Sequence, residues 1–323
     1  MGAAIDLGLI YAIMALGVFL TYRILNMPDL TVDGSFTTGA GATAILLING
    51  VPAIPATAAG FLAGALAGLL TALLHTRLNI DPLLSSILVM IALYSINLRI
   101  MGRANLPLLT TTTREITTLL TPLKQQSLLG TGTSIALLAA GVLAIKFAID
   151  WFMRTNLGLA IQATGDNPGM AASFGVSNRF TKTITLMLAN GLAGLSGAII
   201  AQYQGFADIS MGIGMILVGL ASVIVGNAVL SARHIVVATL GVIVGSILYR
   251  QVIYWALKTQ WLSANDMKLI SAILVVVALV LSSSPVRRNL RRGRRGGQTQ
   301  RDDGVDLAPE PVPAALDRPR AET

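Results

Sequence analysis

Apolar residues in this chain gather in nine runs of roughly helix length, separated by shorter polar stretches. A transmembrane helix needs about 20 predominantly apolar residues. The runs cover residues 4–22, 36–50, 53–74, 82–101, 133–153, 181–203, 213–230, 234–254 and 268–284. The pattern predicts an all-α polytopic membrane protein with about nine transmembrane segments.

The second run, 36–50, is short and rich in Thr and Gly, and Pro28 and Gly34 precede it. These residues predict a broken second span whose N-terminal part is unwound. Lipid tolerates such backbone only where protein shelters it or where it lines a cavity. We therefore expect a route for a polar solute beside this span.

The longest polar interruption lies between the fifth and sixth runs, at Arg154–Phe180. Such a segment leaves the bilayer and acts in water. Asp166 or Asn167 suits a helix N-cap, Pro168 suits the first helical position and Gly175 suits the end. The segment 154–180 is therefore predicted to hold a helix of one or two turns outside the membrane.

The side chains of this predicted helix suit contact with another protein. Small Ala171 and Ala172 lie beside the bulkier Met170 and Phe174, and basic residues flank the segment. Such a surface can seat in a groove on a partner, so the segment is a candidate coupling element. An ordinary structured loop is the alternative.

Composition supports a membrane domain and a separate tail. Hydrophobic residues make up 54% of the chain and charged residues 12%, and the mean hydropathy is +0.72. No stretch before Ser284 has the charge density of a soluble domain. We predict a transmembrane domain over 1–284 and a disordered, Arg-rich tail over 285–323.

The net charge of +8 does not indicate a nucleic-acid partner, because 9 of the 23 basic residues follow Ser284. Such a cluster beside a membrane span is typical of a cytoplasmic end in contact with the lipid bilayer. The tail therefore predicts a cytoplasmic C-terminus. Nine crossings then place the N-terminus outside.

Polar residues within or at the edges of apolar runs are candidates for a translocation pathway, because such residues are costly in lipid. The candidates are Asp29, Thr31, Asp33, Ser35, Asn97, Asn190, Gln202 and Asp208. A hydrogen bond between helices is the alternative for each Asn or Gln. Asp33, between Val32 and Gly34, is the residue we most expect to touch the route or its gate.

Two segments resemble each other: PDLTVDGSFTTGAGATAILL (28–47) and ADISMGIGMILVGLASVIVG (207–226). Both place an Asp and a hydroxyl before a Gly-rich span. With nine spans the copies run in opposite directions, as in transporters built from inverted repeats. Chance similarity is the alternative to an inverted repeat.

The sequence lacks the residues that several kinds of metal, cofactor and catalytic site require. The chain has no cysteine and two histidines, so neither a metal site nor a cofactor is predicted. It also lacks the GxxxxGK[ST] phosphate loop, GxGxxG, HExxH and GxSxG. We expect no enzymatic activity, and any ATP hydrolysis belongs to a separate subunit.

Two stretches of sequence resemble a known family. GDNPGMAASFGVS (165–177), followed by LANGLAGLSGAI, resembles the cytoplasmic coupling segment of ATP-binding cassette (ABC) importer permeases in the branched-chain amino acid and ribose branch. NMPDLTVDGSF (26–36) resembles a subgroup associated with tryptophan or other aromatic amino acids. The similarity extends from about Ala4 to Ser284.

This resemblance implies a permease subunit in the bacterial cytoplasmic membrane, importing a small solute. The implied partners are an ATPase subunit, an extracytoplasmic substrate-binding protein and a second copy of the chain. The implied ATPase-coupling residues are Gly165, Asp166, Asn167, Pro168, Met170, Ala171, Ala172, Phe174 and Gly175. The alternative function is a stand-alone secondary transporter or channel driven by an ion gradient.

Overall fold

The computed structural model describes residues 2–108, 131–230, 234–258, 272–273 and 276, which belong to one compact unit. The predicted tail, 285–323, lies outside the described residues. The elements are α1 (Gly2–Val18), the π-helix η1 (Phe19–Ile24), α2 (Thr31–Ile48), α3 (Ala53–Thr76), α4 (Pro82–Met101), β1 (Asn105–Pro107), α6 (Thr131–Arg154), α7 (Asn156–Asp166), α8 (Pro168–Ser173), α9 (Asn178–Gln204), β2 (Phe206–Asp208), α10 (Met215–Val229) and α11 (Ile235–Lys258).

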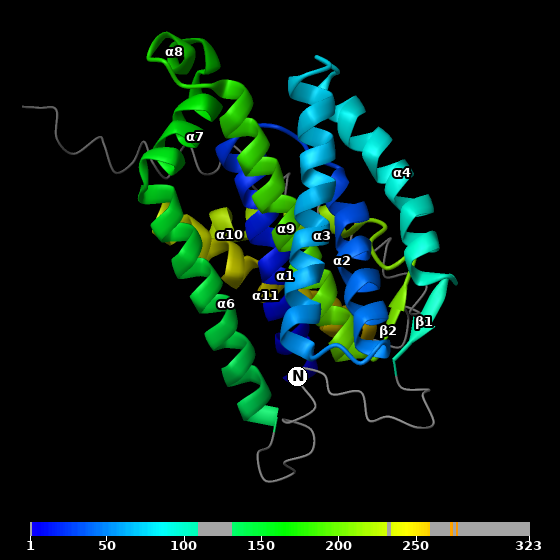
Figure 1. Cartoon of the computed structure of the whole chain (residues 1–323). Coiled ribbons are helices and arrows are strands. Elements are labelled where there is room, and N and C mark those ends of the chain that lie inside the picture. The colour runs from blue at the N-terminus through cyan, green and yellow to red at the C-terminus, as the bar shows by residue number, and fades with distance from the viewer. Residues whose placement is uncertain (1, 109–130, 231–233, 259–271, 274–275, 277–323) are drawn as a thin grey trace, which may run out of the picture. The chain divides into compact units, whose positions relative to one another are not determined.

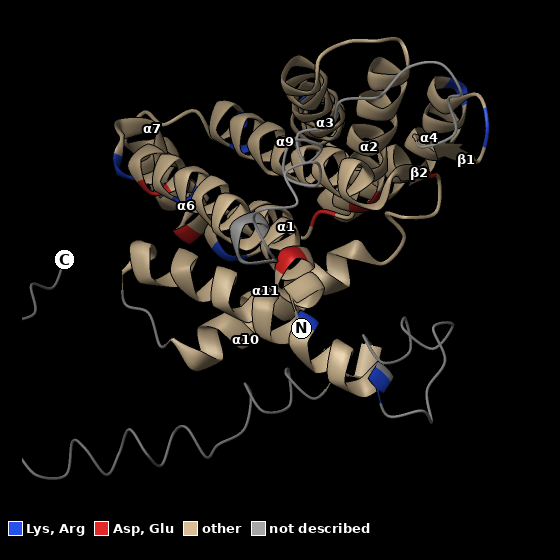
Figure 2. Ribbon diagram, turned by 90° about the horizontal axis from the view of Figure 1, so that it is seen from below, with Lys and Arg blue, Asp and Glu red and all other residues tan. Residues whose placement is uncertain are grey.

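The described part of the chain is a helical membrane bundle. Six of its helical segments are long and apolar enough to cross a bilayer: α1 with η1, α3, α4, α6, α9 and α11. The runs predicted at 36–50 and 213–230 correspond to α2 and to the shorter α10. The ninth run, 268–284, falls largely outside the described residues. Charged residues are sparse along the helices (Figure 2).

Helix α1 is the central element of the bundle. It packs against α6, α9, α10 and α11, and Ile10, Ala12, Met14 and Leu16 are fully or almost fully buried. A helix that is apolar on every side must be enclosed by other helices or by lipid. Here protein encloses α1, while α3, α4 and α6 expose large apolar side chains.

Glycines hold α2, α3 and α9 at short distance from one another. A Cβ at Gly39 would overlap the backbone of Gly194, and a Cβ at Gly68 would overlap the carbonyl oxygen of Leu186. Small residues allow membrane helices to approach backbone to backbone. The small residues in 189–198 therefore form a packing interface of α9 with α2 and α3.

The prediction of a broken second span is wrong for the helix itself. Helix α2 runs without interruption from Thr31 to Ile48. The hydroxyls of Thr37 and Thr38 donate to carbonyl oxygens of the preceding turn, as Thr38 does to Gly34 at 2.8 Å, and the helix continues past them. The irregular backbone precedes α2, at residues 25–30, where Asn26 has a φ of 55°.

A two-stranded antiparallel ribbon joins α4 to α9, which the sequence pattern did not predict. Leu106 of β1 lies opposite Ala207 of β2. The strands are three residues each, too short for a periodic signal. The ribbon lies at the end of the bundle that carries the N-terminus, and α8 lies at the other end (Figure 1).

Candidate functional site

The coupling segment, residues 154–180, contains two helices outside the long spans. Thr155 caps α7 by accepting a hydrogen bond from the amide of Gly158. Asn167 caps α8 by accepting from the amide of Met170 at 3.0 Å, and Pro168 occupies the first turn. Gly175 follows α8 with a φ of 82°. The predicted short helix is confirmed, whereas α7 was not foreseen.

Hydrogen bonds fasten the coupling segment to the start of α9. The hydroxyls of Thr164 and Thr181 share a hydrogen bond of 3.0 Å. The Asn178 side-chain amide donates to the carbonyl oxygen of Pro168 at 2.8 Å. These hydrogen bonds join both α7 and α8 to the first turn of α9.

The segment is also wedged against the end of η1. Gly165 lies so close to the backbone of Ile24 that a Cβ would overlap the carbonyl oxygen of Ile24. Only glycine permits this approach. The segment therefore contacts both the helix that follows it and the central α1–η1 element.

The outer surface of α8 is apolar and exposed. Phe174 is 76% exposed and Met170 is 58% exposed, whereas Ala171 is buried against the segment. Ala172 is exposed between them, and basic Arg154 and Arg179 are exposed nearby. An exposed aromatic side chain at the end of a capped helix is typical of a protein-docking surface.

A second group of predicted residues forms a buried polar network of Asp29, Thr31, Ser35, Thr71 and Asn190. Asn190 donates to the Asp29 carboxylate at 2.6 Å and accepts from the Ser35 hydroxyl at 2.7 Å. Thr31 donates its amide to Asp29 at 2.9 Å and shares a hydroxyl hydrogen bond with Thr71. The structure thus brings four predicted pathway residues together and adds Thr71.

Asp33 lies beside this network and caps α10. Its two carboxylate oxygens accept from the amides of Gly214 at 2.8 Å and Ile216 at 2.7 Å. Asp29 accepts from the first turn of α2 in the same manner. Each carboxylate thereby compensates the partial positive charge at a helix N-terminus.

The network lies far from either end of the long helix α9. Asn190 is 12 residues beyond Asn178 in a helix of 27 residues, which places it about 18 Å along the axis at 1.5 Å per residue. Helices α2 and α10 therefore both begin inside the bundle. The Gly212 backbone also packs directly on Asp33.

Three of the predicted pathway residues lie elsewhere. The Gln202 side-chain amide donates to the Thr57 hydroxyl at 2.7 Å. The Asn97 side-chain amide donates to the Gly34 carbonyl oxygen at 3.4 Å, and Gly34 directly precedes Ser35 of the network. Asp208 lies on β2, where it accepts from Asn105 and from Ser210. Partial burial opposes ionisation of Asp208, but hydrogen bonds from Ser210 and Asn105 outweigh it and lower the pKa of this carboxyl.

Comparison with known proteins matches residues 3–280 to a family described as branched-chain amino acid transport system / permease component. The chain belongs to this family. It is similar to a tyrosine transport system permease protein of Clostridioides difficile, with 42% identity over 84% of this chain and 87% of the relative. It is also 33% identical to an uncharacterized protein of Rickettsia prowazekii, over 67% of this chain and 72% of the relative. No solved structure matches the chain.

Membership of this family makes the chain the permease subunit of an ABC importer, a class that works with ATPase and substrate-binding partners. The coupling segment lies outside the long spans. The polar network lies inside the membrane bundle. The permease therefore separates its candidate docking surface from its candidate pathway.

Sequence reasoning missed one buried ionic group of the permease. Lys146 and Asp150 of α6 are 2% and 5% exposed and form an ion pair. Asp150 also accepts from the Thr239 hydroxyl of α11 at 2.8 Å. Opposite charges four residues apart in an apolar run were the available signal. The group fastens α6 to α11.

Within the described residues of the permease, no group of three His, Asp or Glu side chains is arranged to hold a metal ion.

Proposed function

We propose that this permease imports an amino acid across the bacterial cytoplasmic membrane, using a docking surface on α8 for a separate ATPase subunit. An extracytoplasmic binding protein delivers the solute to the end of the bundle that carries the β1–β2 ribbon. ATP binding and hydrolysis in the partner move α8. The bundle then exchanges outward for inward access.

The observation that carries this proposal is the exposed apolar surface of α8 together with its attachments. Phe174 is the most exposed large apolar side chain in the described residues of the segment. A partner that binds one position of α8 more tightly than another shifts the equilibrium between the outward-open and inward-open bundle. The Thr164–Thr181 and Gly165–Ile24 contacts carry that bias to α9 and to η1.

The proposed pathway follows the polar network and the N-termini of α2 and α10. Carboxylates and amides there, including Asp29, Asp33 and Asn190, are hydrogen-bonded inside the membrane domain. Similarity to a tyrosine transport permease supports an aromatic amino acid as the solute. We propose a homodimer and a cytoplasmic C-terminus, which the basic cluster at 287–295 supports.

Association of the permease with its ATPase subunit tests the docking surface. Phe174→Ala should lower co-purification of the ATPase by about tenfold or more. Truncation of a central aromatic side chain typically costs about 2 kcal/mol or more of binding free energy, and each 1.4 kcal/mol is about tenfold in affinity. Phe147→Ala is the matched control, because Phe147 is 63% exposed on the long helix α6. Equal recovery of the ATPase with both variants would contradict the proposal.

A further inference from the structure

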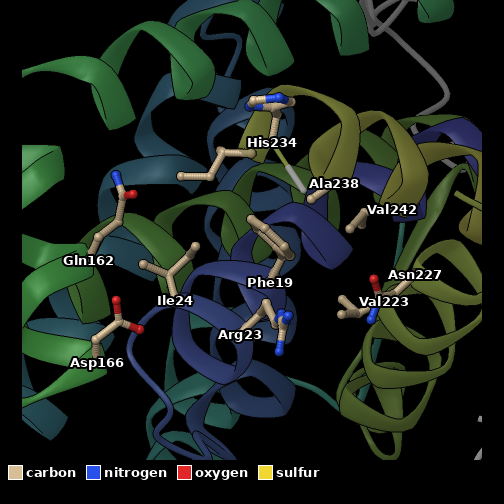
Figure 3. A pocket seen from close by; sticks show the side chains of 11 residues that line it. Phe19, Arg23, Ile24, Gln162, Asp166, Val223, Asn227, His234, Ala238 and Val242 are labelled. Carbon is tan, nitrogen blue, oxygen red and sulfur yellow. The ribbon is translucent and has the colours of Figure 1, made fainter. Parts of the chain in front are cut away.

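A polar cavity of about 260 Å³ opens between η1, α7, α10 and α11 (Figure 3). Its charged and polar lining includes Arg23 of η1, Asp166 of α7, Asn227 of α10 and His234 beside α11. Phe19 and Val242 form part of an apolar wall. The cavity therefore combines a cation, an anion and an apolar surface.

The two charged groups of the cavity are not engaged with each other. The ion pair found among the described residues is Lys146–Asp150, which does not involve the cavity. Within the same residues, neither the Arg23 nor the Asp166 side chain makes a hydrogen bond. A guanidinium binds a carboxylate through two parallel hydrogen bonds. Arg23 can therefore receive an anionic group.

Asp166 favours a cation for two reasons. It is the last residue of α7, where the helix dipole places partial negative charge, and its own carboxylate adds to that charge. Its side chain lies on the wall of the cavity, across from Arg23 (Figure 3). An ammonium group at this position would be attracted by both.

The size of the cavity limits the ligand to a small molecule. At about 30 Å³ for each water molecule, 260 Å³ holds roughly nine waters. Pockets for drug-sized ligands begin near 300 Å³. Nucleotides and peptides are too large to be enclosed.

We propose that this cavity binds a free α-amino acid with an apolar side chain. Arg23 receives the α-carboxylate, Asp166 receives the α-ammonium, and the side chain lies against Phe19 and Val242. The bound amino acid then bridges α7 of the coupling segment to η1. In the importer proposed above, on which this step rests, the bridge restrains the coupling segment. Amino acid that has accumulated in the cytoplasm therefore slows further import.

Binding of L-phenylalanine to the purified full-length permease, measured by calorimetry, tests the site. The wild type should bind L-phenylalanine more tightly than phenethylamine, which lacks the carboxylate, or 3-phenylpropionate, which lacks the ammonium. Arg23→Gln should weaken L-phenylalanine binding about tenfold or more and leave phenethylamine binding unchanged. Arg77→Gln is the matched control, because Arg77 is an exposed arginine directly after α3.

Thermal unfolding of Arg23→Gln and its recovery with the ATPase subunit report separately on the fold and on the docking surface. No binding by the wild type would overturn the proposed site. Equal affinity of the wild type and Arg23→Gln would also overturn it.

In proteoliposomes that carry ATPase and binding protein, L-phenylalanine on the α8 side should slow uptake by the wild type and not by Arg23→Gln. Equal inhibition of both would overturn the restraint on import. Absence of uptake with intact L-phenylalanine binding would instead contradict the proposed function.

Discussion

At the scale of single residues, the carboxylates of Asp29 and Asp33 cap helices that begin inside the bundle. Their hydrogen bonds go to backbone amides of Thr31, Gly214 and Ile216. The sequence predicted that these side chains matter, because acidic residues beside a Gly-rich span are costly in lipid. It could not predict that Asp33 caps a helix 181 residues later in the chain.

Asp33→Asn should destabilise the permease by about 1–3 kcal/mol, because one of two partly buried backbone amides loses its acceptor. The change should lower the thermal unfolding midpoint in detergent. Asp81→Asn is the matched control: Asp81 caps α4 through one oxygen, which accepts from Leu83 and Leu84, and it is exposed. Equal midpoints for the two variants would contradict the capping role of Asp33.

At the scale of elements, local sequence chemistry predicted α8 well and the ribbon not at all. Asn167, Pro168 and Gly175 act within a few residues of one another, so their pattern can be recognised along the chain. The β1–β2 ribbon depends on pairing of Leu106 with Ala207, a contact between distant segments. The glycines of α2 likewise pack against distant segments, Gly39 against α9 and Gly34 and Gly41 against α4.

The contact of α7 with η1 predicts a specific defect in coupling. Gly165→Ala should push α7 away from the Ile24 carbonyl, at a cost of about 1–3 kcal/mol for overpacking. ATP-driven uptake into proteoliposomes should fall severalfold, whereas the ATPase should still co-purify. Gly141→Ala, on α6 where a Cβ has open space, should transport normally. Normal uptake by Gly165→Ala would show that this contact does not transmit motion.

At the scale of the whole molecule, composition and the nine apolar runs predicted a polytopic helical bundle, and the family match confirms a transport permease. Eight of the nine runs coincide with described helices. The assignment of polar residues to a pathway stays a prediction, because Asn97 and Asp208 lie apart from the network of Asp29, Ser35 and Asn190. Sequence gives residue types, whereas a pathway depends on which side chains the packed helices bring together.

The energy source of the whole assembly separates the proposed importer from a stand-alone transporter. Proteoliposomes with the permease alone should take up no amino acid under a proton or sodium gradient. Addition of the ATPase, the binding protein and ATP should start uptake. Gradient-driven uptake by the permease alone would favour the stand-alone transporter.

Contact between α8 and the ATPase is the central claim, and disulfide cross-linking in native membranes tests it most directly. The chain contains no cysteine, so Ala172→Cys introduces a single thiol on the exposed side of α8. We predict a cross-link to a cysteine placed in the ATPase groove, with a yield that changes when ATP is added. Modification of Cys at position 172 by an impermeant reagent outside sealed cells, with no cross-link to the ATPase, would contradict the account.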